Sequence, residues 1–352
     1  MSTRADPTRR KRLLTGDRPT GRLHLGHYVG TLAHRVQLQD THDVFLVIAD
    51  YHMLTTHHHR EQIAQAADHI RDVVLDYLSV GIDPAKVTIY VQSQVPEVCE
   101  LQVLLSMLVS VARAQRMPTL KEVMTAQHIA QPSMGLLSYP ILQAADILLM
   151  RADTVPVGKD QVAHVELCRD LARRFNRLYG EVFAEPEALL SDVPLLVGTD
   201  GQAKMSKSLN NAIFLSDPDD AIYQKVMHMY TDPTRIHATD PGHVEGNPVF
   251  TYHDVFNPDR DEVDDLKQRY RRGQIGDVEV KQRLYHVLQA FLAPIRTRRA
   301  RYAAEPQLVE ELLRQGHATA AIEAEETMQQ VRHAMGLPYR GEMGDALTLQ
   351  IS

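Results

Sequence analysis

The sequence predicts an α/β fold, in which a Rossmann-like doubly wound parallel sheet is followed by an all-α helical domain. Up to residue 91, short apolar runs of strand length alternate with segments of helical periodicity. A glycine-rich turn joins the first of these strands to the first helix. Beyond residue 217 only helical periodicity remains. At 352 residues, of which 44% are hydrophobic, the chain is long enough for two domains.

The first strand is predicted to end at Leu13 and Leu14, because glycine and proline at positions 16, 19 and 21 mark a turn after it. A helix is predicted from about His24. Its apolar positions recur at helical spacing: Leu25, Val29, Leu32, Val36 and Leu38.

This helix start has the features of a nucleotide site. Free N–H groups and the positive dipole end of a helix favour phosphate. Gly26 has no side chain to keep a base or ribose away, and His24 and His27 lie on one helix face, where both can reach phosphate oxygens. The alternative is a solvated helix start that happens to carry two histidines.

Further strands are predicted at Val44–Asp50 and Val87–Val91, with a helix over residues 60–79 that ends at Gly81. Ligands of such sheets bind beyond the carboxyl ends of the strands. We therefore expect His24, Gly26 and the turn 50–52 to share one site.

Residues 97–151 interrupt this alternation and predict a helical insertion. Its apolar runs, Leu101–Val111 and Ile141–Leu149, are separated by Arg116–Glu122. Val155–Val157 and Val193–Val197 are predicted to return to the sheet, with a helix at about 160–178 between them. Residues 12–216 then form the first domain.

Residues 217–336 are predicted to form the all-α domain, flanked by a basic flexible tail at 1–11 and a C-terminal tail at 337–352. Arginines at positions 296, 298, 299 and 301 have two open interpretations, contact with RNA phosphate or a solvated helix end.

Composition narrows the function classes. A net charge of -7 argues against broad adhesion to nucleic acid, and no apolar run reaches the ~18 residues of a membrane span. Cys99 and Cys168 do not predict a zinc site or a disulfide framework, which favours a cytoplasmic protein. We expect no protein-bound metal, since the consecutive side chains of His57–His59 do not converge on one ion.

A second motif, Lys204-Met205-Ser206-Lys207-Ser208, favours the interpretation of the histidine turn as a nucleotide site. His24-Leu25-Gly26-His27 together with this motif resembles the signature pair of class I aminoacyl-tRNA synthetases. The blocks 139–149 and 155–161 are similar to those of the tryptophanyl-tRNA synthetase family of bacterial type, and the resemblance covers residues 12–336.

The resemblance implies a ligase that activates tryptophan with ATP and Mg²⁺ and transfers it to the 3′ end of its tRNA. It implies a catalytic domain at 12–216, a homodimer built through 97–151, and anticodon recognition by 217–336. The tyrosyl enzymes share both signatures but not Ala144-Ala145-Asp146, and small nucleotidyltransferases lack the second motif. A non-catalytic paralogue that binds tryptophan and ATP as a regulatory module is the alternative function.

The family's site residues carry over position by position. The catalytic groups would be His24, His27, Lys204 and Lys207. The ATP contacts would be Arg18, Pro19, Thr20, Gly26, His27, Gly158, Lys159, Asp160, Leu195 and the run Lys204, Met205, Ser206, Lys207 and Ser208. The tryptophan pocket would be Leu14, His52, Tyr139, Gln143, Asp146, Val155, Val157 and Gln161.

Asp146 is also informative by itself, because a carboxylate inside an apolar helical run needs a donor, and an indole N–H is a donor only. A structural cap or ion pair is the alternative. Three positions depart from many relatives: Gln143 for methionine, Arg18 for glutamine, and Val123 for an ATP-contacting lysine, with Lys121 as the substitute.

Overall fold

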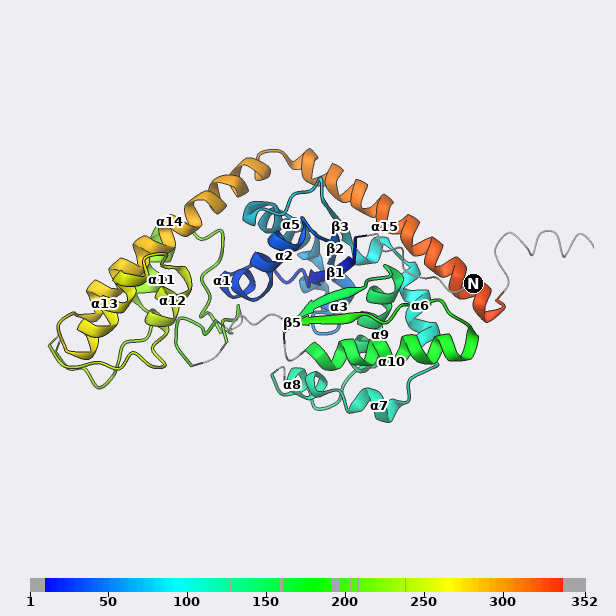
Figure 1. The fold of residues 1–352 in the computed structure, drawn as a ribbon, viewed down its shortest axis with the longest axis horizontal. Helices are drawn as coiled ribbons and strands as arrows, with labels where there is room; N and C mark the ends of the chain where they lie inside the picture. The colour runs from blue at the N-terminus through cyan, green and yellow to red at the C-terminus, as the bar shows by residue number, and fades with distance from the viewer. Residues whose placement is uncertain are drawn as a thin grey trace, which may run out of the picture.

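The computed structural model describes residues 10–126, 128–158, 161–190, 196–202, 204–207, 209–237 and 239–337. Figure 1 shows a central sheet with helices packed around it and a group of helices to one side, joined by two long helices that form an arch. Within the described ranges, none of the helices is both long and apolar enough to cross a membrane.

The sheet has five parallel strands in the order β3-β2-β1-β4-β5, as the alternation of apolar runs predicts. Successive residues of β1 point into different cores: Leu13 packs with one apolar cluster and Leu14 with the other. Helices therefore cover both faces, which explains the continuous apolar strands. The strands are β1 (Arg12–Asp17), β2 (Asp43–Ile48), β3 (Val87–Val91), β4 (Thr154–Val157) and β5 (Glu187–Leu190).

The prediction that β1 ends at Leu14 is wrong by three residues, because Gly16 belongs to the strand and the turn follows Asp17. A Cβ at position 16 would lie 1.9 Å from the carbonyl oxygen of Val47 on β2. Glycine is there to let two strands approach, and in sequence this use is indistinguishable from a turn.

The helices between β1 and β3 are close to those predicted. The predicted helix at 60–79 breaks at Gln65 into two, and Gly81 ends the second with a left-handed φ of 109°. The first predicted helix contains one π-helical stretch, η1. The elements are α1 (Leu25–His27), η1 (Tyr28–Leu32), α2 (Ala33–Leu38), α3 (Asp50–Leu54), α4 (Arg60–Ala64) and α5 (Ala66–Val80).

The insertion after β3 is helical as predicted, but its internal boundaries differ. The first apolar run is divided, since a helix stops at Ser106 and the next begins at Val111, where Ser110 caps its first turn. The separator Arg116–Glu122 is partly a helix of its own, beginning at Pro118. The elements are η2 (Gln92–Gln94), α6 (Glu97–Ser106), α7 (Val111–Gln115), α8 (Pro118–Ala126) and α9 (Met134–Leu149).

The predicted helix at about 160–178 is α10 (Val162–Tyr179), and the last strand among the described residues lies before the predicted segment 193–197. The strand that pairs with β4 is Glu187–Leu190 rather than Val193–Val197. Of the predicted segment, residues 193–195 lie outside the described residues, and Val197 makes only an isolated antiparallel bridge with Lys204. The short connection after α10 brings residue 187 back to the sheet at once.

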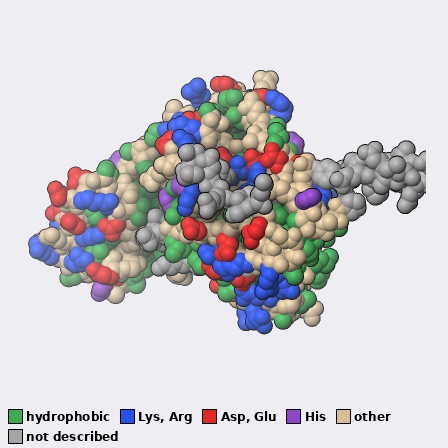
Figure 2. Space-filling model, turned by 45° about the vertical axis from the view of Figure 1, so that its right-hand side comes forward, with side chains coloured by type: hydrophobic (Ala, Val, Ile, Leu, Met, Phe, Trp, Pro, Cys, Tyr) green, Lys and Arg blue, Asp and Glu red, His purple; other side chains and the backbone are tan. Residues whose placement is uncertain are grey.

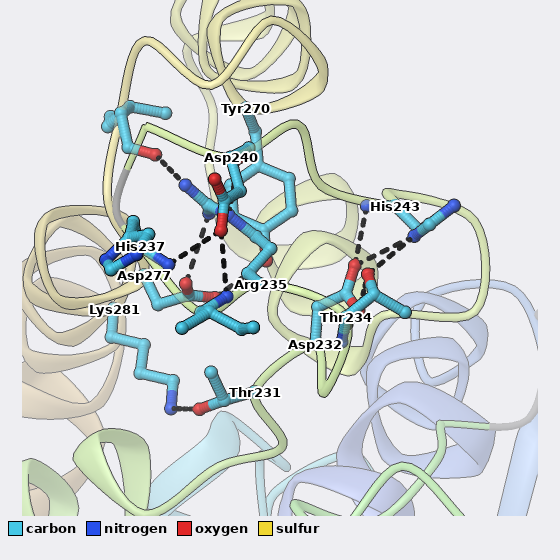
Figure 3. A network of polar contacts seen from close by, with 12 residues as sticks. Thr231, Asp232, Thr234, Arg235, His237, Asp240, His243, Tyr270, Asp277 and Lys281 are labelled. Carbon is cyan, nitrogen blue, oxygen red and sulfur yellow. Dashed lines mark hydrogen bonds and ion pairs between the residues drawn. The ribbon is translucent and has the colours of Figure 1, made fainter.

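Beyond residue 217 the described elements are helices. Buried polar contacts fix the loop between the first two of them (Figure 3). Arg235 pairs with Asp277 at 3.1 Å and lies over the ring of Tyr270, whose hydroxyl donates to Asp277. The elements are α11 (Asp219–Met227), α12 (Pro248–Phe256), α13 (Arg260–Arg271), α14 (Asp277–Ala303) and α15 (Pro306–Met335).

The last helix returns to the sheet. α15 runs along β3, where Gly316 lies so close that a Cβ there would be 1.8 Å from the carbonyl oxygen of Ile89. Arg12 on β1 also binds Glu323 of α15 at 2.7 Å. The final part of the predicted helical domain thus packs against the first domain.

Candidate functional site

The two histidines of the first motif lie together at the start of α1. Their rings are 3.8 Å apart, and the backbone N–H of His24 donates to Nδ1 of His27 at 3.2 Å. A neutral His27 therefore carries its proton on Nε2. Nδ1 of His24 is buried and has no hydrogen-bond partner among the residues that the structure describes.

Burial and nearby positive charge keep both imidazoles neutral at physiological pH. Burial is the main cause that lowers the pKa of His24 to about 2, with the charges of His27 and Lys207 acting in the same direction. Burial also lowers the pKa of His27 to about 4, although Asp17 opposes this. These side chains thus offer neutral N–H groups rather than fixed cations.

The second motif contacts the first directly. The backbone N–H of Gly26 points to Sδ of buried Met205 at 3.3 Å. A Cβ on Gly26 would lie 3.0 Å from the ring of His24 and 3.3 Å from Cβ of Met205, so a larger residue would crowd both motifs. The structure thus brings together two segments that are far apart in the chain.

Lys207 extends the second motif over the turn that follows β1. Its Nζ donates to the carbonyl oxygen of Gly21 at 2.7 Å and lies 3.4 Å from Oγ1 of Thr20. Gly21 has a φ of 106°, which a residue with a side chain rarely adopts. Burial lowers the pKa of Lys207 to about 8, while Asp17 and Asp76 oppose the shift.

Asn211 fixes the second motif from behind. Its Oδ1 accepts the N–H of Ser206 at 2.7 Å, and its Nδ2 donates to Asp200 at 3.1 Å. Lys204 is exposed, and its backbone forms an isolated antiparallel β-bridge with Val197. Sequence reasoning did not single out Asn211, which resembles any loop asparagine until its burial is known.

A buried ion pair under the turn was also missed. Asp17 accepts from Arg35 at 2.5 Å and from the hydroxyl of Tyr77 at 2.7 Å. Burial favours a raised pKa for Asp17, but the charges of Arg35 and His27 outweigh it and bring that pKa to about 2. A fixed negative charge therefore lies beneath the basic groups.

The second group of predicted residues surrounds Asp146 on α9. Its carboxylate accepts from Nε2 of Gln92 at 2.8 and 2.9 Å and is 2.9 Å from Nε2 of His52. Both Asp146 and Gln92 are buried. Gln92 was missed, although a polar residue directly after β3 lies where strand ends carry ligand contacts.

Tyr139 and Gln161 join this group through a chain of hydrogen bonds. The Tyr139 hydroxyl lies 2.5 Å from Oγ1 of Thr119, which is 2.6 Å from Nε2 of His164, and Nδ1 of His164 is 2.7 Å from Gln161. The ring of Tyr139 also meets that of His52 edge to face. Leu14, Val155 and Val157 are buried in the adjoining core, and Gln143 is half-buried on α9.

The structure shows what surrounds several other residues that the sequence analysis named. Val123 packs against the core, whereas Lys121 is exposed. Three of the four arginines at the end of α14 bind protein groups: Arg296 binds Asp219, Arg298 binds Ser79, and Arg299 binds Asp72 and Asp76. Contact of these arginines with RNA phosphate stays a prediction.

Some predicted groups carry no structural description. Lys159, Asp160, Leu195 and Ser208 lie outside the described residues, as do most of the two tails. Cys99 and Cys168 are free thiols. On the face drawn in Figure 2, basic and acidic side chains are interspersed rather than gathered into one basic surface.

Comparison with known proteins agrees with the geometry. The family described as tRNA synthetases class I (W and Y) matches residues 6–293. A tryptophan–tRNA ligase of Treponema pallidum is 57% identical over 329 residues, which are 94% of this chain and 98% of the relative. One of Chlamydia caviae is 54% identical over 333 residues, 94% of this chain and 96% of the relative.

A solved structure extends the likeness to the fold. The tryptophanyl-tRNA synthetase from Campylobacter jejuni, complexed with ADP and tryptophan, has a TM-score of 0.81 at 35% identity. The match covers 93% of this chain and 100% of that chain.

Proposed function

The chain belongs to the class I tRNA synthetases of the W and Y family, and from this membership we propose that the His24–His27 turn and residues 204–208 form its ATP site. The chain activates tryptophan with ATP, releasing pyrophosphate, and transfers tryptophan to its tRNA. The observation that supports the ATP site best is the contact between Gly26 and Met205, which places a lysine-bearing loop over a helix start.

The chemistry asks for groups that stabilise developing negative charge. The tryptophan carboxylate attacks the α-phosphorus of ATP, and charge grows on the phosphoryl oxygens and the departing pyrophosphate. Lys207 supplies a cation, and His24 and His27 supply neutral donors. The unpartnered, buried Nδ1 of His24 is consistent with a group held ready for a ligand. ATP enters with Mg²⁺ on its phosphate oxygens, where the ion neutralises charge.

The pocket around Asp146 takes the tryptophan side chain. Asp146 accepts the indole N–H, since among the described residues its Oδ1 accepts from Gln92 alone and retains a lone pair for a further donor. His52 and Gln92 hold the carboxylate in place. Leu14, Val155 and Val157 form the apolar walls, and Tyr139, Gln143 and Gln161 lie at the edge.

The same proposal includes a homodimer formed through the insertion 97–151. Four large apolar side chains there are more than half exposed: Val103, Met107, Val111 and Met134. Residues of this kind on neighbouring helices suit a self-complementary interface. The helices of 217–336 bind the tRNA anticodon, and the free thiols favour the cytoplasm.

Amino-acid-dependent exchange between ATP and labelled pyrophosphate tests the proposal. We expect exchange with tryptophan and far less with tyrosine or phenylalanine. His27→Ala should raise the KM for ATP, and Asp146→Ala should raise the KM for tryptophan. If His27→Ala changes neither kcat nor the KM for ATP, the ATP site lies elsewhere.

A further inference from the structure

Asp76 of α5 is a fully buried carboxylate that no part of the proposed chemistry uses. One of its oxygens accepts the backbone N–H of Leu23 at 2.7 Å, and the other accepts from Nε of Arg299 at 2.8 Å. Burial raises the pKa of Asp76 despite these two partners. An uncompensated charge at this position would be costly, so Arg299 is needed to keep the carboxylate ionised.

Leu23 lies directly before His24 and is tied on its other side as well. Its carbonyl oxygen accepts the N–H of Leu215 at 3.0 Å, and the N–H of Leu25 donates to Ile213 at 2.9 Å. The segment 23–25 is thus held between residues 213–215 and Asp76. The place of the His24 ring depends on this segment, because His24 directly follows Leu23, the residue that Asp76 holds.

Arg299 reaches this point from α14, the long helix that packs on α5 (Figure 1). Its guanidinium also binds Asp72, so it spans two carboxylates one turn apart on α5. A planar guanidinium is suited to such a two-point contact, whereas a lysine ammonium is not.

Arg298, the preceding residue, makes a different contact with the same helix. Its Nε donates to the carbonyl oxygen of Ser79 at 2.6 Å and does not bind Asp76. The two neighbouring arginines therefore both fasten α14 to α5, but only Arg299 continues to the segment before His24.

We propose that Arg299 and Asp76 are positioning residues for amino-acid activation: they hold the N–H of Leu23 and thereby set His24 and His27 against ATP. α14 thus acts on the ATP site through one buried chain of contacts, Arg299 to Asp76 to Leu23. This rests on the proposed location of ATP beside His24.

The test measures tryptophan-dependent ATP–pyrophosphate exchange for Arg299→Ala, with Arg298→Ala as the matched control. We expect Arg299→Ala to lower kcat about ten- to hundredfold, the scale of a small misplacement at a reacting centre. The KM for tryptophan should stay unchanged. Arg298→Ala should lower the melting temperature without changing kcat. Arg299→Lys keeps one contact and should restore part of the rate.

Two outcomes would overturn the inference: equal kcat for the two alanine variants, or a parental kcat in an Arg299→Ala protein that melts earlier. If Arg299→Ala does not fold, the comparison of Arg299→Lys with Arg298→Lys decides in the same way. His27→Ala separates this inference from the ATP site itself: if it leaves kcat and the KM for ATP unchanged, the site is wrong whatever Arg299 does.

Discussion

Lys207 holds an ammonium group in a partly buried place that disfavours charge. Its pKa of about 8 is below the ordinary 10.5 because of burial, so the free protein loses this proton just above neutral pH. Binding of phosphate would favour the charged form. The position therefore suits a cation that pairs with the phosphate of a bound ligand rather than with a protein carboxylate.

We predict that kcat/KM for ATP falls as pH rises through about 8, since the free protein then loses the Lys207 charge. Lys207→Arg should move this fall to higher pH, because a guanidinium stays protonated. Lys207→Ala should raise the activation free energy of adenylate formation by ~2 to 4 kcal/mol and so lower the single-turnover rate. Stopped-flow or quench-flow measurements across the pH range give both results.

An unchanged pH profile in Lys207→Arg would show that another group titrates. A melting curve at each pH is the control, so that loss of rate is not confused with unfolding.

Asp146 differs from Lys207 in that its charge already has partners. Asp146→Ala removes the proposed acceptor of the indole N–H and leaves the Nε2 groups of His52 and Gln92 without their acceptor. We predict that tryptophan activation weakens by at least ~1 to 3 kcal/mol and that discrimination against phenylalanine shrinks. Exchange assays with both amino acids measure this.

The chain has no tryptophan, so indole fluorescence reports the bound ligand directly. Asp146→Asn, which keeps an acceptor oxygen, should lose less. If Asp146→Ala binds and activates tryptophan as the parent does, the pocket lies elsewhere.

For single residues, the sequence indicates side chains that belong to a motif, but it does not indicate the buried polar side chains that hold them in place. His24, His27 and Lys207 stand in recognisable runs, and Asp146 is conspicuous in an apolar helix. Gln92, Asn211 and Asp76 are ordinary polar residues whose importance comes from burial and from partners distant in the chain. Periodicity carries no information on such partners.

Among the elements, α15 has the most consequential placement. It lies along β3, one of the two edge strands of the described sheet, with Gly316 against the backbone of Ile89. Edge strands expose unpaired N–H and C=O groups, and a helix that covers them prevents pairing with other chains.

We predict that Gly316→Ala destabilises the protein by about 1 to 3 kcal/mol, because a Cβ there would lie 1.8 Å from the Ile89 carbonyl oxygen and α15 would have to move. Thermal and urea unfolding measure the change. The control is Gly135→Ala on α9, where the nearest atom to the new Cβ is 3.8 Å away.

Gly135→Ala should be neutral or stabilise by roughly 0.5 to 1 kcal/mol, because alanine favours a helix. Equal unfolding free energies for the two variants would mean that α15 is not tightly seated on β3.

The type of each element was predictable because the spacing of apolar residues distinguishes strands from helices. This holds for β2, β3, α5 and α10. The errors are at places where long-range contacts decide. Gly16 stays in β1 because of Val47, and Glu187–Leu190 pairs with β4 although 193–197 is more apolar. The amphipathic pattern of α15 shows that one face of the helix is buried, but it does not show which strand that face packs against.

For the whole molecule, the exposed apolar residues of the insertion form the surface that the proposed dimer would bury. We predict that Met107→Asp yields a monomer, since a charge at this interface would be desolvated on association. Sedimentation velocity measures the mass. Ile236→Asp is the control, because Ile236 is 84% exposed but lies among the residues of the helical part.

A dimer that survives Met107→Asp, or a parent that is already monomeric, would contradict the interface. Exchange activity of the variant then shows whether each subunit works alone.

The return of α15 to β3 also has a consequence for synthesis on the ribosome. β3 ends at Val91, whereas α15 begins at Pro306, so the strand leaves the exit tunnel long before its cover is made. At about 5 to 20 residues per second, the nascent sheet waits roughly 10 to 40 s with a bare edge. Closure of this edge therefore waits until α15 has been made, and stalled chains that stop before residue 306 should be the species that chaperones retain.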